Sequence, residues 1–210
     1  LAGASSAGCK LINVGAEDLL KEKRNLVLSL LSQLVKMALL DKVHVTRTPS
    51  LCQLVDSNIG ETLEDVMNMP TEQLLIRWVN HHLDNAKKGE MQINNFGEDI
   101  KDGKVYIYLL SQLVPEIVKP EEIADDAERR YEATLSAIEQ IGLERLIGPQ
   151  DIANGDARLN LAFVAALFDC RSGLHVPSTS NMADIQLAHQ ELEQEVLQLK
   201  IRRVKDITKK

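Results

Sequence analysis

Aromatic residues are scarce in this 210-residue sequence: phenylalanine, tyrosine and tryptophan together make up 3% of it, and there is one tryptophan. A core built with so few rings must consist mainly of leucine, isoleucine, valine and alanine, which suits packed helices better than β-sandwiches. No stretch alternates between apolar and polar residues as a half-buried strand does. We therefore expect an all-α protein of one or two domains.

Long apolar runs are also missing. The longest uncharged one, residues 26–35, is interrupted by serine and glutamine and is shorter than the roughly 20 residues that a bilayer span needs. The sequence starts at Leu1 without the charged and apolar regions of a secretory signal, so we expect a cytoplasmic protein without a membrane span. Cys9, Cys52 and Cys170 lack metal-ligand spacing and are typical of reduced intracellular thiols.

Signals for chemistry are weak throughout the sequence. The net charge of -7 argues against a nucleic-acid partner, because such a surface is usually basic. The neighbours His81 and His82 point about 100° apart on a helix and cannot form one metal site. Asp99 and Asp102 are expected to cap helices, and the acidic run at residues 121–128 to be a solvated face. No catalytic, metal-binding or cofactor-binding residue is predicted, so we expect neither an enzyme nor a cofactor.

The segment 71–88 contains the tryptophan and opens the longest stretch suited to a complete helical domain. Its apolar residues recur every three or four positions, and they are Leu74, Leu75, Trp78, Val79 and Leu83. Pro70 suits the start of a helix and Gly89 its end. The spacing therefore predicts a helix of about four to five turns whose tryptophan faces the core.

Further helical patterns follow this segment. Residues 105–113 form an apolar stripe that Pro115 ends, residues 125–141 have apolar positions at spacings of three and four, and residues 159–168 are apolar on nearly all sides. A polar turn precedes the last of them. We therefore place a complete all-α module at residues 70–171. Its expected core anchors are Trp78, Leu109, Leu161 and Phe168.

A weak internal repeat precedes this module. A glycine, an aspartate, a polar turn and a mostly apolar helix occur up to residue 40 and again up to residue 168. Only the second occurrence has its first half present, so residues 1–46 are expected to be the C-terminal part of a first module. Chance similarity between two leucine-rich helices is the alternative.

Residues 47–69 are expected to be a partly helical linker that packs on the modules, because a flexible tether would contain more glycine and serine. Thr48 followed by Pro49 predicts a capped helix start, and Gly60 predicts the end of that helix.

The amino-acid composition changes after the complete module, from residue 172 onward. A loop is expected at residues 172–181, which are rich in serine, glycine and proline. Ile185, Leu192 and Leu199 are then spaced by seven, a heptad pattern of under three repeats. Residues 182–210 are therefore expected to form an amphipathic helix that self-associates through these three residues. A solvated or intramolecularly docked tail is the alternative.

Several stretches together resemble the calponin homology family, and specifically its fimbrin and plastin branch. They are GCKLINVGAEDL at residues 8–19, LLIRWVNHHL at 74–83, INNFGEDIKDGKVYIYLLSQLVPE at 93–116 and GPQDIANGDARLNLAFVAALFD at 148–169. Their order and wording over about residues 1–177 carry the resemblance. It implies the second half of a first calponin homology module, its linker and the whole second module of an actin-binding tandem.

The resemblance also implies a partner. In this family, paired modules bind the side of filamentous actin, and two pairs in one chain crosslink filaments into bundles. The binding surfaces that this sequence represents are the last helix of the first module, residues 25–40, and the first helix of the second module, residues 71–88. Candidate actin contacts on them are Gln33, Lys36, Arg77, His81, Lys87 and Lys88. For each of these, an ordinary helix-surface role is the alternative.

The sequence departs from the family's pattern in two ways. The opening helices of the first module are absent. After Pro177, where fimbrins carry a second actin-binding tandem, the sequence does not resemble one. Bundling would then require a homodimer through the C-terminal helix. We expect an actin-filament binding and crosslinking protein of the cytoplasmic cytoskeleton. The alternative is a calponin homology scaffold that binds a helical partner or microtubules through residues 25–40 and the tail, without bundling actin.

Overall fold

The computed structural model describes residues 37–86, 91–122 and 125–175, together with the single positions 183, 187 and 190. The chain forms two compact units, Leu1–Lys42 and Val43–Lys210. In the first unit, residues 37–40 are helical. The sequence places the boundary between first module and linker at residue 47, whereas the second unit already begins at Val43.

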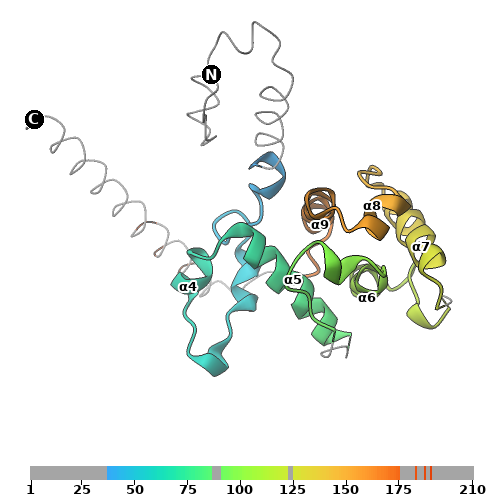
Figure 1. The fold of residues 1–210 in the computed structure, drawn as a ribbon. Helices are drawn as coiled ribbons and strands as arrows, with labels where there is room; N and C mark the ends of the chain where they lie inside the picture. Colours follow the sequence, from blue (N-terminus) through green and yellow to red (C-terminus); the bar gives the residue numbers. More distant parts are fainter. Residues whose placement is uncertain are drawn as a thin grey trace, which may run out of the picture. The chain divides into compact units, whose positions relative to one another are not determined.

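Helices form all the regular structure of the described residues (Figure 1), which confirms the all-α prediction for them. The α-helices are α4 (Leu63–Met67), α5 (Thr71–Asn85), α6 (Lys104–Leu113), α7 (Ala127–Gln140), α8 (Pro149–Asn154) and α9 (Ala157–Cys170). Four short 3-10 helices lie between them: η1 (Pro49–Leu54), η2 (Ser57–Ile59), η3 (Glu98–Ile100) and η4 (Pro120–Glu122).

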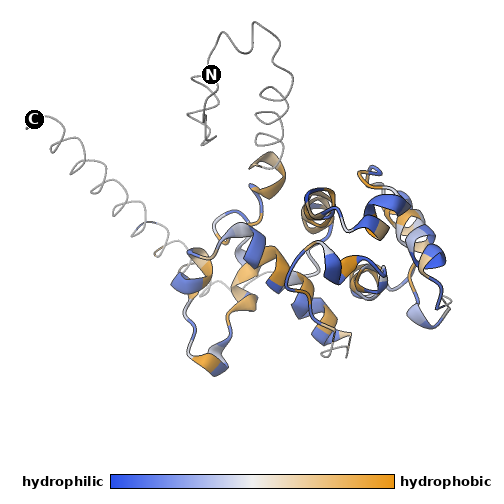
Figure 2. Cartoon of the chain, in the orientation of Figure 1, coloured by the Kyte–Doolittle hydropathy of each residue, from blue (hydrophilic) through white to orange (hydrophobic). Residues whose placement is uncertain are grey.

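Helix α5 carries the tryptophan and has one buried side. Its buried residues are Leu74, Leu75, Trp78, Val79, His82 and Leu83. All the apolar residues among them belong to the stripe read from the sequence, and Figure 2 shows hydrophobic and hydrophilic residues on opposite sides of this helix. The helix ends at Asn85 with Ala86 as its C-cap, before the predicted stop at Gly89. Residues 87–90 lie outside the described part of the chain.

The core of the second unit lies between α5, α6 and α9. Helix α6 packs on α5 and α7, while α9 packs on α5 and α8. Trp78 and Leu109 are 0% exposed, Phe168 2% and Leu161 5%. The rings of Trp78 and Phe168 meet edge to face with their centroids 5.2 Å apart, a geometry that stabilises aromatic pairs beyond the area they bury. This contact joins the first long helix of the unit to the last.

Helix α8 lies where the sequence interpretation expects only a polar turn before the last helix, and it corrects that expectation. Pro149 occupies its first turn, where a missing N–H has no consequence. The N–H of Gly148 donates to the carboxylate of Asp151 at 2.8 Å. Gly155 ends the helix with φ 63°, in the left-handed region. All these signals are present in the sequence, but the helix of six residues is too short to show periodicity.

Two of the expected helix caps are also wrong. The carboxylate of Asp99 accepts from the N–H groups of Asn94 and Asn95, at 2.6 and 3.1 Å, and orders the loop before η3. Thr48 precedes η1 without a side-chain cap bond to it. Asp102 does accept from the N–H of Lys104 at 2.9 Å, in the first turn of α6.

The linker does not form the one helix that Thr48 and Gly60 predict. It contains the separate turns η1 and η2, and Gly60 ends η2 with φ 72°. The apolar side chains Leu51 and Leu54 of η1 are covered, at 0% and 5% exposed. Helix α5 contacts η1 directly, so this part of the linker packs on the unit that follows it.

Candidate functional site

Helix α5 carries the described candidates for partner binding. Arg77 and His81 are one helical turn apart on it, and both are partly exposed. The remaining candidates lie outside the described residues, and they are Gln33, Lys36, Lys87, Lys88, Ile185, Leu192 and Leu199.

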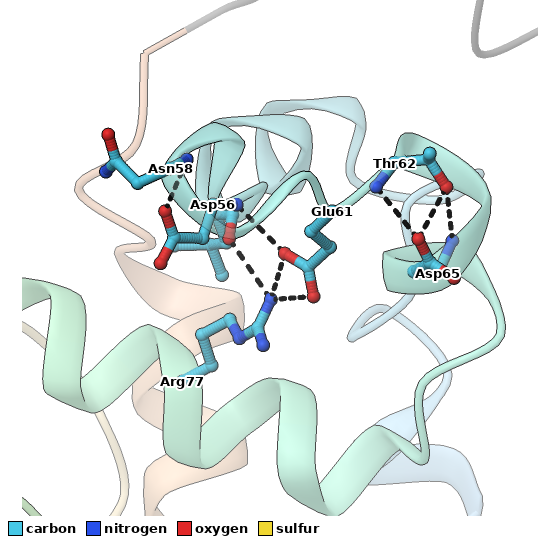
Figure 3. Close-up of polar contacts among 7 residues, drawn as sticks. Asp56, Asn58, Glu61, Thr62, Asp65 and Arg77 are labelled. Carbon is cyan, nitrogen blue, oxygen red and sulfur yellow. Dashed lines mark hydrogen bonds and ion pairs between the residues drawn. The ribbon is translucent and has the colours of Figure 1, made fainter.

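The guanidinium of Arg77 is occupied inside the unit. Its Nη1 donates to both carboxylate oxygens of Glu61, at 2.7 and 2.6 Å, and to the carbonyl oxygen of Leu54 at 3.3 Å (Figure 3). The Glu61 side chain is 9% exposed and that of Arg77 31%. The hydrogen bond from Arg77 holds the pKa of Glu61 below its ordinary value, although burial opposes this. The two charges therefore neutralise one another between the linker and α5.

Glu61 also closes the turn that precedes it. Its carboxylate accepts from the N–H of Asp56 at 2.9 Å. The carboxylate of Asp56 in turn accepts from the N–H of Asn58 at 3.0 Å. Residues Asp56–Glu61, here named the linker turn, are therefore ordered by their own polar groups, and Arg77 is bonded to their last member (Figure 3).

The start of α4 follows the linker turn directly. Asp65 accepts from the N–H of Thr62 at 2.9 Å and from its hydroxyl at 2.7 Å. The N–H of Asp65 donates back to the Thr62 hydroxyl oxygen at 3.3 Å. These reciprocal bonds form a capping box, and the two bonds that Thr62 donates to the carboxylate hold the pKa of Asp65 below its ordinary value. The linker turn thus lies beside α5 and leads directly into a well-capped helix (Figure 3).

His82 lies on the buried side of α5, unlike its neighbour His81. It is 3% exposed, and its Nε2 lies 2.9 Å from the carbonyl oxygen of Ser172, so Nε2 carries the hydrogen. Trp78 donates its indole N–H to the same oxygen at 2.7 Å. Burial lowers the pKa of His82, and the bond to Ser172 offsets this only in part. The side chain is therefore neutral at pH 7 and has a structural role.

His81 is half-buried on the outer side of α5. Burial lowers the pKa of its imidazole, and the nearby charge of Asp84 offsets this in part. Its Nε2 lies 3.1 Å from the amide nitrogen of Asn85, which can only donate, so Nε2 is an acceptor. With His81 neutral and Arg77 paired, the described side of α5 offers hydrogen-bonding groups more than free positive charge.

The sequence interpretation missed three residues that order this region. Spacing could have identified His82, because it follows Trp78 by four positions on the buried stripe. Asn80 donates to the carbonyl oxygen of Ile93 at 2.9 Å and accepts from its N–H at 2.8 Å. Ser172 acts through its backbone carbonyl, which no side-chain pattern can reveal.

An open cavity of about 530 Å³ lies between the end of α5, α6 and η4, and its lining includes Ala86, Tyr108, Ser111, Gln112 and Val118.

In the described part of the chain, no group of three or more histidines, cysteines or carboxylates is placed to hold a metal ion. No helix among those residues is both long and apolar enough to span a bilayer.

A family model for the calponin homology (CH) domain matches residues 69–173. Plastin-1 of Bos taurus is 38% identical over 205 residues, which are 93% of this chain and 32% of the relative. Plastin-3 of Homo sapiens is 38% identical over 87% of this chain and 30% of its own length. Fimbrin-4 of Arabidopsis thaliana is 40% identical over 83% of this chain and 26% of its own. The chain thus spans about a third of the length of these relatives or less.

The fold is also similar to that of a solved structure. The crystal structure of the actin-crosslinking core of Schizosaccharomyces pombe fimbrin aligns with 83% of this chain at a TM-score of 0.65 and 30% identity. The alignment covers 33% of that chain. Sequence and fold therefore point to the same group of proteins.

Proposed function

The chain belongs to the calponin homology (CH) domain family, within which it resembles the plastins and fimbrins, and from this premise we propose that it binds actin filaments. The observation that carries the proposal is the likeness, over 83% of the chain, to the actin-crosslinking core of a fimbrin. Residues 1–46 would be the end of a first module, residues 47–69 its linker and residues 70–171 the second module. The protein would act at the cytoplasmic actin cytoskeleton.

The proposed contact surface on the second module is the outer side of α5. His81 is half-buried there and presents a neutral imidazole. Lys87 and Lys88 follow the described end of the helix in sequence and would add positive charge. In the first module, Gln33 and Lys36 are the corresponding candidates. We expect the lysines to give the interaction its salt dependence, since the charge of Arg77 is already paired.

Crosslinking requires two filament-binding sites in one particle. A longer protein would supply them as a second tandem, and a dimer of this chain would supply them through Ile185, Leu192 and Leu199. We propose the second route for the chain as it stands. Sedimentation equilibrium tests it, because a monomer at high concentration contradicts self-association through the tail.

Co-sedimentation with filamentous actin tests the proposed function. We expect saturable pelleting that weakens from about 50 mM to about 200 mM salt, because these concentrations span the range in which screening sets in. Replacing Lys87 and Lys88 together with glutamine should weaken it further, whereas the charge-matched variant Arg129→Gln with Arg158→Gln should not, since these exposed residues lie on α7 and α9. Pelleting no better than background contradicts the proposal. Pelleting with microtubules alone would favour a scaffold role.

A further inference from the structure

Arg77 is a candidate filament contact whose charge is already paired with Glu61. One nitrogen, Nη1, has three acceptors, all of them in the linker: Glu61 Oε1 at 2.7 Å, Glu61 Oε2 at 2.6 Å and the Leu54 carbonyl oxygen at 3.3 Å (Figure 3). Charge-assisted bonds of this length are stronger than neutral ones. To meet a partner with this nitrogen, Arg77 would first have to give up these bonds.

Glu61 is too well covered to be a filament contact itself. Its side chain is 9% exposed, and its carboxylate accepts from the N–H of Asp56 as well as from Arg77. Whatever Glu61 contributes must therefore pass through the linker turn and α5. This makes it a useful probe, because its substitution changes the ion pair without removing a surface that a partner could touch.

Within the part of the chain that the structure describes, no other ion pair attaches the linker turn to its surroundings. Its backbone bonds, from Ile59 and Glu61 to Asp56 and from Gly60 to Ser57, are local and order only the turn. Ile59, its apolar side chain, is 73% exposed and so adds little apolar burial. Among the described residues, the ion pair between Glu61 and Arg77 is thus the charged connection that fixes the linker turn to α5.

We infer that Arg77 is a positioning residue: through Glu61 it holds the linker turn against α5, so that a filament binding to α5 meets an ordered surface. This inference rests on the proposed function. A turn that is already ordered in the free protein loses no further freedom when a partner binds beside it, which favours binding. The role of Arg77 in affinity is therefore indirect, and the direct contacts on the described part of α5 lie beyond it, at His81.

The variants Arg77→Gln and Glu61→Gln separate the two roles. If Arg77 positions the turn, both variants should raise the Kd for filaments about fivefold, the lower end of typical coupling between sites, and the double variant should raise it no further. If Arg77 binds the filament directly, Glu61→Gln frees its guanidinium, so Glu61→Gln should leave the Kd unchanged or lower it. That second pattern would overturn the inference.

Arg145→Gln and Glu139→Gln are the matched controls, because this ion pair of 2.9 Å is half-exposed on both sides and joins α7 to the loop behind it. They should leave the Kd unchanged. All pelleting is measured well below the unfolding midpoint of every variant. Amide hydrogen exchange of residues 56–61 should accelerate in Arg77→Gln and in Glu61→Gln but not in the controls.

The outcomes distinguish this inference from the proposed function. Faster exchange or a lower unfolding midpoint with an unchanged Kd shows that the ion pair is merely structural and contradicts the inference alone. Failure of the unsubstituted chain to pellet contradicts the proposed function and, with it, the claim about filament affinity. Unchanged exchange in both glutamine variants contradicts the positioning of the linker turn whatever the filament result.

Discussion

The indole N–H of Trp78 donates a hydrogen bond of 2.7 Å to the backbone carbonyl of Ser172, 94 residues further along the chain. His82, one turn later on α5, reaches the same oxygen with Nε2 at 2.9 Å. One carbonyl group thereby has two donors from the same helix. The segment behind α9 is fixed on α5 by these bonds as well as by the packing of Trp78 on Phe168.

The variant Trp78→Phe tests the importance of this attachment. It removes one of the two donors to Ser172 and leaves space beside Phe168, and we expect the free energy of unfolding to fall by about 2 kcal/mol. Urea denaturation followed by far-UV circular dichroism measures it, because the variant has no tryptophan fluorescence. A loss below about 0.5 kcal/mol, the size of an ordinary surface substitution, would show that His82 alone suffices.

The stability should also depend on pH through the two histidines of α5. Burial lowers the pKa of His82 and of His81 below the ordinary value of about 6.5. A group whose folded pKa is depressed favours the folded state fully above its unfolded pKa. We therefore expect the free energy of unfolding to be constant above about pH 7 and to fall as the pH drops below about 6.5.

Urea midpoints measured across this range check the pH prediction. His82→Gln keeps a donor for Ser172 but cannot titrate, so it should flatten the pH dependence of the free energy of unfolding. His81→Gln is the matched comparison, because it removes the other titrating imidazole of α5. The imidazole titration curves from NMR should both have midpoints below the ordinary value. A curve for His82 centred above that value would contradict the prediction.

Glycine substitutions offer a matched pair. Gly155 and Gly60 both have positive φ, 63° and 72°, but a Cβ on Gly155 would lie 3.0 Å from the backbone oxygen of Gly97 and 2.5 Å from Cε of Lys101, whereas a Cβ on Gly60 has nothing within 4 Å. Gly60→Ala should lower the free energy of unfolding by about 1 kcal/mol, the strain of a left-handed residue.

Gly155→Ala should lower the free energy of unfolding by at least about 1 kcal/mol more than Gly60→Ala, because a backbone oxygen cannot move aside as a side chain can. Chemical denaturation of the two variants in parallel gives the difference. Equal losses would mean that the loop containing Gly97 shifts freely.

A buried polar pair lies between α6 and α9. The hydroxyl of Tyr106 donates to Oδ1 of Asn160 at 2.8 Å, both residues are 0% exposed, and Nδ2 of Asn160 has no partner within the described part of the chain. Tyr106→Phe should lower the free energy of unfolding by about 1–2 kcal/mol, because it leaves the Asn160 amide without its hydrogen bond.

Adding Asn160→Leu to Tyr106→Phe removes the remaining polar group. We expect the double variant to lose less stability than the sum of the two single variants, since replacing both partners by apolar groups is far less costly than orphaning one. The double-mutant cycle, measured by urea denaturation, is the test. Additive losses would contradict a direct interaction.

The sequence predicts the long helices well because each has an apolar stripe that repeats over several turns. The segment 71–88 shows this for α5, whose apolar stripe and start agree with the prediction, since Pro70 marks that start as well. Helix α8 is too short for such a pattern. Asp99, read as a helix cap, bonds loop amides instead, because aspartate caps turns and helices with the same geometry.

Side-chain spacing reveals much less about the candidate site. It shows that Arg77 and His81 lie outside the buried stripe, but it cannot show that Arg77 meets Glu61, which lies 16 positions earlier in a segment without periodicity. The neutral state of His81 depends on the burial of its imidazole, which lowers its pKa. Both facts arise from tertiary packing, and they change which charges remain available to a partner.

The amide of Gln53 donates to the carbonyl oxygen of His175 at 2.5 Å, so η1 lies beside the segment that follows α9. A pulling force applied between the linker and the segment that follows α9 would act across this short contact. It would also act across the bonds that Trp78 and His82 donate to Ser172. If the proposed crosslinking places the chain under tension between filaments, these polar bonds would be the first contacts to carry the load.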